Sequence, residues 1–120
     1  MRHAMEFQEF VENQVFSPSL VATALRTTKT EIADTLGLGQ DAFSRASRIR
    51  ARKTQTRLRQ MLEILHRVSS HTGSDLAAYA WFRAEHLPGF GGMTPDQLVR
   101  EGKADDVHAH LDRVMAGGYA

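Results

Sequence analysis

The chain has 120 residues, 42% of them apolar, which is enough for one small domain or two very small ones and too few for a large catalytic cleft. It contains no cysteine, which excludes disulfides, thiolate metal sites and a cysteine nucleophile. The net charge of +1 hides an asymmetry, because residues 41–67 carry eight basic and two acidic side chains between two acidic flanks. No apolar run approaches the roughly 18 residues of a membrane span, and the early glutamates are unlike a secretory signal, so we expect a cytoplasmic protein.

The first two predicted helices lie before residue 28. Apolar residues recur at helical spacing at Phe7, Phe10, Val11 and Val15. This periodicity predicts an amphipathic N-terminal helix within residues 1–16. Ser17 and Pro18 then have the form of an N-cap followed by proline in the first turn, which predicts the start of a second helix. Thr28 and Glu31 fit a capping box and predict a third.

Residues 29–49, KTEIADTLGLGQDAFSRASRI, have the pattern of a helix-turn-helix. This motif needs a small residue where its helices cross, a glycine in the turn and apolar residues on the inner faces. Ala33 and Gly37 meet the first two demands. The inner positions hold Ile32, Leu36, Leu38, Phe43 and Ala46. We therefore predict a second helix from about Gln40 to Arg50 that enters the major groove of DNA.

The outward positions of that second helix are polar or charged. They are Gln40, Asp41, Ser44, Arg45 and Arg48. Arginine can bond guanine in a bidentate manner and glutamine can bond adenine likewise, whereas a carboxylate repels phosphate unless it accepts from a cytosine amino group. The cations that follow are placed for phosphate contacts: Arg50, Arg52, Lys53 and Arg57. The pattern predicts operator DNA as a partner, bound by a homodimer because paired half-sites multiply specificity. The alternative is a helical hairpin with a solvated basic face.

Apolar stripes mark further helices downstream. The first stripe comprises Leu58, Met61, Leu62, Leu65 and Val68. Ser74 is a candidate N-cap for a helix containing Leu76, Ala77, Ala80 and Trp81. A last helix is marked by Val107, Leu111 and Val114. Because no segment alternates with period two for long enough to indicate a sheet, we predict an all-α fold.

Residues 86–98, HLPGFGGMTPDQL, hold three glycines and two prolines and predict a tight connection between two helices. Thr94 as N-cap, Pro95 in the first turn and Gln97 at the capping-box position restart the helix. We expect Phe90 to pack back into the core. The glycines have neither the preceding strand nor the lysine of a phosphate-binding loop.

The histidines and carboxylates give no catalytic or metal-binding pattern. His108 and His110 are two positions apart, about 200° around a helix, and cannot converge on one metal. Asp105 and Asp106 lie where they complement the dipole of the last helix. We therefore expect no catalytic residue, no metal and no cofactor.

Residues 79–120 resemble the toxin-binding domain of the Xre/MbcA/ParS antitoxins. The family pattern is a Trp-led helix, a Pro and Gly-Gly-x-Thr-Pro loop, an apolar-apolar-x-x-Gly helix and a final helix ending in Gly and a small residue. The matching positions are Trp81, Pro88, Gly91, Gly92, Thr94, Pro95, Leu98, Val99, Gly102, Val107, Leu111 and Gly117. These antitoxins place a helix-turn-helix upstream, so the resemblance extends over about residues 17–120.

The resemblance implies a type II antitoxin, with a helix-turn-helix DNA-binding region at 17–68 that represses its own operon and a toxin-binding domain at 69–120. Many members pair with RES-domain toxins, which degrade NAD and whose active-site entrance the antitoxin's C-terminal tail blocks. The toxin-binding residues implied are Trp81, Pro88, Gly91, Gly92, Thr94, Pro95, Leu98, Gly117, Gly118, Tyr119 and Ala120. Two alternatives stay open: a stand-alone helix-turn-helix transcriptional regulator without a toxin partner, and an interaction protein that does not bind DNA.

Overall fold

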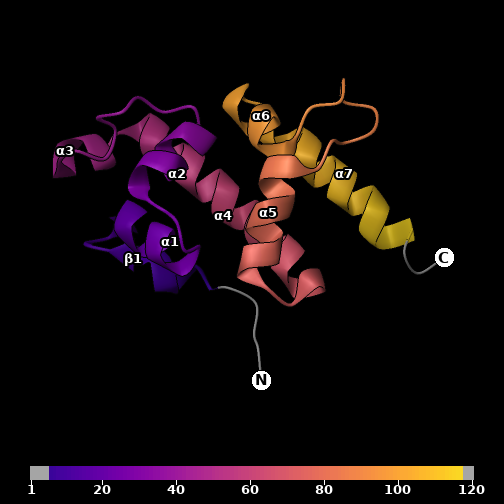
Figure 1. Ribbon diagram of the computed structural model, residues 1–120, viewed down its shortest axis with the longest axis horizontal. Coiled ribbons are helices and arrows are strands. Elements are labelled where there is room, and N and C mark those ends of the chain that lie inside the picture. The colour runs from indigo at the N-terminus through magenta and orange to yellow at the C-terminus, as the bar shows by residue number, and fades with distance from the viewer. Residues whose placement is uncertain (1–5, 118–120) are drawn as a thin grey trace.

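One long helix, α4 (Arg52–Thr72), runs through the middle of the molecule (Figure 1). The computed structural model describes residues 6–117. Before α4 come η1 (Phe7–Phe10), β1 (Val11–Glu12), β2 (Val15–Phe16), α1 (Pro18–Ala24), α2 (Lys29–Thr35) and α3 (Ala46–Ile49). After it come α5 (Asp75–Ala84), α6 (Pro95–Arg100) and α7 (Ala104–Gly117). The predicted all-α fold class is confirmed, since the only strands in residues 6–117 form one short hairpin.

The predicted N-terminal helix is wrong over its described part, residues 6–16. One 3₁₀ turn, η1, is followed by an antiparallel hairpin with Val11 opposite Phe16. Asn13 and Gln14 form the tip at φ of 53° and 69°, the left-handed conformation that two-residue hairpin turns require and asparagine tolerates. The β-branched residues Val11 on β1 and Val15 on β2 favour the extended backbone, which the helical periodicity concealed.

The predicted helix starts are confirmed where a side chain caps them. The Ser17 hydroxyl accepts from the Leu20 N–H at 3.2 Å, and Pro18 is the first residue of α1. The Ser74 hydroxyl caps α5 by accepting from the Ala77 N–H at 3.2 Å. These are local interactions within one turn, which is why the sequence alone indicates them.

The predicted helix from Gln40 to Arg50 is wrong, because only Ala46–Ile49 is helical. The Ser44 N–H and hydroxyl both donate to the Asp41 carbonyl, at 3.1 and 2.8 Å, and close a turn that competes with the helix. Arg45 then has an extended backbone before α3 begins. Ala46 is exposed rather than on the inner face, and the half-buried Ile49 packs against the core in its place.

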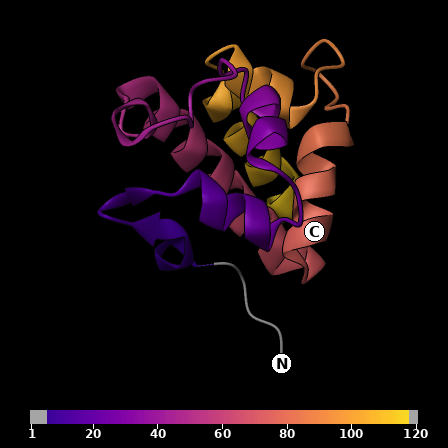
Figure 2. The same ribbon diagram turned by 60° about the vertical axis from the view of Figure 1, so that its left-hand side comes forward.

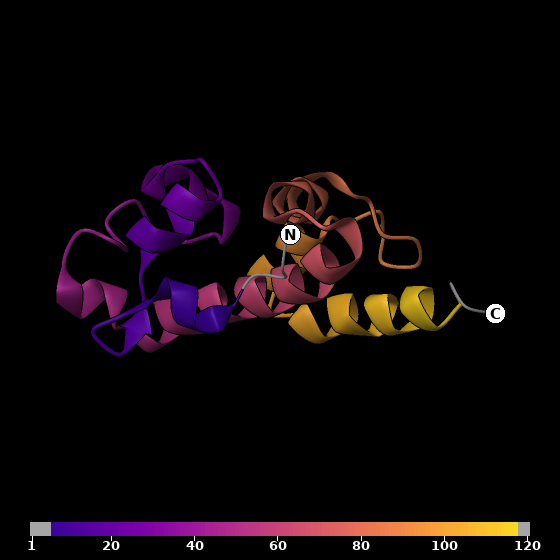
Figure 3. The same ribbon diagram turned by 90° about the horizontal axis from the view of Figure 1, so that it is seen from below.

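Both halves of the molecule share one core. The elements before α4 gather at one end of the molecule and those after it at the other (Figure 3). The predicted apolar stripe of α4 is buried at all five positions: Leu58, Met61, Leu62, Leu65 and Val68. It joins Ile32 and Leu36 on α2 and Phe82 on α5 in a single hydrophobic cluster. The division predicted at residue 68 therefore falls inside a helix that serves both ends. Within residues 6–117 no helix has the length and apolarity to span a membrane.

Candidate DNA-facing and toxin-facing surfaces

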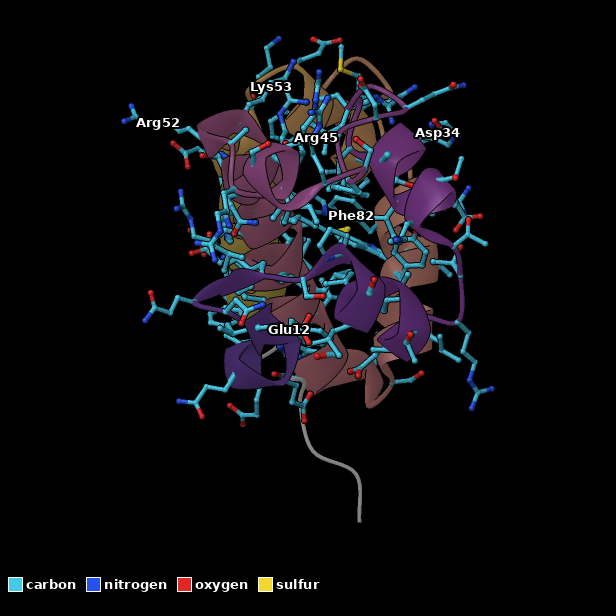
Figure 4. The ribbon with its side chains drawn as sticks, turned by 90° about the vertical axis from the view of Figure 1, so that its left-hand side faces the viewer. Glu12, Asp34, Arg45, Arg52, Lys53 and Phe82 are labelled. Atoms are coloured by element: carbon cyan, nitrogen blue, oxygen red, sulfur yellow. The ribbon has the colours of Figure 1, made fainter. Side chains whose placement is uncertain are left out.

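Exposed cations gather at the end of the molecule formed by α3 and the start of α4. Figure 4 shows Arg45, Arg52 and Lys53 projecting outward from this end. Arg45 immediately precedes α3, whereas Arg52 and Lys53 lie in the first turn of α4. We call these three residues, together with Arg48 of α3, the basic end. Gln40 and Ser44 are also exposed beside it, as predicted for residues that face a ligand.

The acidic residue predicted at the reading surface has a partner within the protein. The Asp41 carboxylate lies 3.3 Å from the Arg48 guanidinium, and both side chains are about half exposed, at 64% and 46%. An ion pair at that exposure contributes only about 0–1 kcal/mol. Asp41 therefore neutralises Arg48 in the free protein, and separating the two costs little.

Two of the arginines predicted to contact DNA donate hydrogen bonds to backbone carbonyls of the protein itself. The Arg57 guanidinium is half-buried and donates to the Leu36 carbonyl at 2.6 Å and to the Arg100 carbonyl at 3.1 Å. Arg57 thus joins the C-terminal ends of α2 and α6 and is turned away from the basic end. Arg50 donates to the Asn13 carbonyl at 3.0 Å, which ties the end of α3 to the hairpin tip.

A polar cluster joins α2 to α5, and we call it the junction: Thr27, Glu31, Thr35, Tyr79 and Arg83. The Glu31 carboxylate accepts from the hydroxyls of Thr27 and Tyr79, at 2.5 and 3.1 Å, and lies 3.3 Å from the Arg83 guanidinium. The Tyr79 hydroxyl also lies 3.1 Å from that of Thr35. Only half of the predicted capping box forms, because Thr28 accepts from the Glu31 N–H while the Glu31 carboxylate turns to the junction.

Glu31 and Tyr79 of the junction have shifted pKa values. The hydrogen bond from the Thr27 hydroxyl, with smaller contributions from Tyr79 and Arg83, lowers the pKa of Glu31 despite its partial burial. Burial raises the pKa of Tyr79 to about 12. A lowered carboxyl pKa means that the contact stabilises the fold above the ordinary pKa of glutamate and is lost as pH falls through the folded-state value.

A second contact between the halves passes over the predicted helix-turn-helix glycine. Gly37 has φ +66°, which confirms the predicted left-handed stop after α2. The stem of Arg100 lies directly over it, so that a Cβ added at Gly37 would lie 2.7 Å from the Arg100 Cδ. The Arg100 guanidinium continues to the Thr35 carbonyl at 3.0 Å and to the Asp96 carboxylate at 3.2 Å. Gly37 is required both for its backbone conformation and for this approach.

The glycine-rich connection between α5 and α6 is a closed loop on the surface. The Leu87 N–H donates to the Met93 carbonyl at 2.9 Å, and the His86 Nδ1 lies 2.6 Å from the Gly92 carbonyl oxygen. Three positive φ values permit this path, at Gly89, Gly91 and Gly92. The half-buried Phe90 packs at the border of the core and edge-on against His110 of α7, 6.4 Å between ring centroids.

The predicted toxin-binding residues divide by burial. Pro88, Gly91 and Gly92 are exposed on the loop, and Trp81 is half-buried. Three are buried and shape the start and packing of α6: Thr94, Pro95 and Leu98. The Gln97 side chain accepts from the Thr94 N–H at 2.9 Å, as a capping box requires. Gly117 is the last residue of α7, and the predictions for Gly118, Tyr119 and Ala120 lie outside the described residues.

Sequence reasoning missed an apolar groove beside Trp81. It lies between the end of α4, α5 and the last turns of α7, with a volume of about 420 Å³. Its walls are formed by Val68, His71, Thr72, Trp81, Leu111, Val114 and Met115. Val114, one of the apolar residues that mark the last predicted helix, is 54% exposed on the rim of this groove. The helical spacing of the apolar residues could not show that the outer end of α7 extends past its neighbours (Figure 1).

Residues 57–117 match the family model of the antitoxin Xre/MbcA/ParS C-terminal toxin-binding domain. The matched segment is just over half of the chain and contains the groove, the glycine-rich loop and the whole of α5, α6 and α7. The chain therefore belongs to this antitoxin family, and its C-terminal part is a toxin-binding domain. The match begins inside α4, upstream of the family pattern at residues 79–120. Neither the curated proteins nor the solved structures gave a match.

Because the Arg100 side chain lies over Gly37, a substitution at Gly37 tests this close approach as well as the left-handed backbone conformation. Gly37→Ala should lower the free energy of unfolding by about 1–2 kcal/mol for the left-handed backbone, with a further loss for the clash with Arg100. Gly73→Ala is the matched control, since its φ is +73° and nothing lies within 4 Å of the added Cβ. Urea denaturation measures both. Equal losses in the two variants would show that the approach of Arg100 to Gly37 is unimportant.

Proposed function

We propose that the protein is the antitoxin of a type II toxin–antitoxin pair that neutralises a RES-domain toxin and represses its own operon. The family match supports the toxin-binding half of this proposal. The observation that carries the rest is the placement of two different surfaces at opposite ends of α4. The cationic one surrounds α3, and the apolar one lies between α5 and the end of α7.

For DNA binding, we infer that residues 17–68 act as a helix-turn-helix with a shortened second helix. Arg45, Gln40 and Ser44 are exposed where base edges would be read, and Arg48 becomes available once it leaves Asp41. Arg52 and Lys53 are placed for phosphate. A four-residue α3 offers few base contacts, which favours a homodimer that reads two half-sites one helical turn apart. Arg57 is not part of this surface.

For toxin binding, we infer that the groove beside Trp81 and the exposed loop residues Pro88, Gly91 and Gly92 form the docking platform. The end of α7 then directs the C-terminal segment from Gly117 to Ala120 toward the active-site entrance of the toxin. Glycines allow a close backbone approach, Tyr119 offers area and a hydroxyl, and the terminal carboxylate can pair with a basic group that otherwise holds the phosphate of NAD. Because α7 ends far from α3, a bound toxin leaves the basic end free (Figure 1).

The DNA proposal predicts different effects for the individual arginines. Arg45→Ala should weaken binding to the chain's own promoter by about 1–3 kcal/mol and reduce discrimination against scrambled DNA, because a bidentate base contact is lost. Lys53→Ala should weaken binding to both DNAs equally and reduce its salt dependence. Fluorescence anisotropy at several salt concentrations measures these effects, with Lys103→Ala, an exposed cation on the other half, as the control. Unchanged discrimination in Arg45→Ala would contradict the assignment.

The toxin proposal predicts that the C-terminal segment neutralises without supporting the fold. Deleting residues 116–120 keeps Met115, which packs at the border of the core, and should leave helicity and promoter binding intact. Protection of cells that express the toxin should be lost. Growth rescue by the truncated antitoxin, at matched expression, measures this. Full rescue would contradict blocking by the C-terminal segment, while co-purification with the toxin would still report docking on the platform.

A further inference from the structure

The shortness of α3 requires an explanation of how it is held in place. An isolated helix of four residues is unstable in water, since it forms almost no complete turn of hydrogen bonds. None of the four residues of α3 is fully buried, and no side chain caps its N-terminus. Contacts from elsewhere must therefore fix the orientation of the arginines on and beside it.

Gln55, near the start of α4, provides such a contact. Its Nε2 donates to the Ile49 carbonyl at the end of α3, at 2.9 Å, and to the Phe16 carbonyl of β2, at 3.0 Å. Its Oε1 accepts from the Phe16 N–H at 2.9 Å. One half-buried amide thus uses both its donors and its acceptor to fasten β2 and α3 to the same point on α4.

The hairpin makes a second attachment to α3. Arg50, immediately after α3, donates to the Asn13 carbonyl at the hairpin tip, at 3.0 Å. Figures 2 and 3 both show the hairpin tip and α3 at the same end of the molecule. The N-terminal hairpin and Gln55 thus both hold the C-terminal end of α3 by hydrogen bonds.

We propose that Gln55 is a positioning residue for DNA recognition: by clamping the hairpin and α3 to α4, it holds Arg45 and Arg48 in the orientation that reads bases. The inference rests on the proposed DNA binding. Gln55 acts through α3, because its amide faces two backbone carbonyls inside the protein. The position requires an amide, since a carboxylate would place negative charge against both carbonyl oxygens and remove both donors.

The hydrogen bonds of Gln55 can be removed without unfolding α4. Alanine favours the helix more than glutamine does, and the buried side chains on either side of position 55, Thr54 and Leu58, stay in place. Gln55→Ala should therefore leave α4 and the core intact while freeing α3. A general loss of stability would affect all helices alike, whereas loss of the clamp affects α3 first.

The test combines hydrogen exchange with DNA binding in Gln55→Ala and Gln55→Glu. Three amides report on α3, because Arg48 and Ile49 donate to the Arg45 carbonyl and Arg50 donates to that of Ala46. Their exchange should accelerate about two- to tenfold, the effect of losing one net hydrogen bond, while exchange in α5 and α7 stays unchanged. Discrimination between promoter and scrambled DNA should fall by a similar factor. Gln60→Ala, further along the same helix, is the control and should change neither.

Three outcomes overturn the proposal, and they are distinguishable. Unchanged exchange at Arg48, Ile49 and Arg50 in both variants would show that Gln55 does not hold α3. Faster exchange with unchanged discrimination would show that α3 needs no positioning by Gln55 to read DNA. If the wild-type protein showed no preference for its promoter, the proposed DNA binding would fall and the role of Gln55 in recognition with it, even where the exchange data reveal a clamp.

Discussion

The burial of one face of α4 against both ends of the molecule is the constraint on which the rest of the structure depends. Leu58, Leu62 and Leu65 have no solvent exposure, and the cluster they belong to reaches from α2 to α5. Each fully buried leucine contributes about 1.5–3 kcal/mol, so neither end could lose α4 and keep its core. The toxin-binding domain and the surface that we propose to bind DNA are consequently parts of one folding unit.

Polar contacts then fix how the two ends are oriented. The junction ties α2 to α5 through Glu31 and Tyr79, and Arg57 and Arg100 bond carbonyls at the ends of α2 and α6. Hydrogen bonds are directional, and breaking one of these half-buried hydrogen bonds leaves a donor and an acceptor unsatisfied. The arrangement favours a fixed angle between the basic end and the apolar groove over a hinge between two domains.

The sequence predicted the features that are local. Ser17, Ser74 and Gly37 act within one helical turn, and the stripe on α4 needs only a helix to be recognised. It did not predict what depends on distant partners. Charge alone could not show that Arg57 points inward to the Leu36 carbonyl, nor that Ser44 would bond Asp41 and shorten α3. The hairpin could not be predicted because the spacing of Phe7, Phe10 and Val11 also fits one face of a helix. In addition, Gln55, which holds the hairpin through Phe16, is 39 residues away from it in the sequence.

Comparing the stability of the two ends tests most directly that they form one unit. Trp81, the only tryptophan, reports on the toxin-binding domain by fluorescence, while the Leu36 amide, bonded to the Ile32 carbonyl, reports on α2 by hydrogen exchange. In increasing denaturant, both probes should give the same free energy of unfolding and the same dependence on denaturant. If α2 opened at a lower free energy while Trp81 kept its native fluorescence, the two ends would be separate domains and the shared role of α4 would be contradicted.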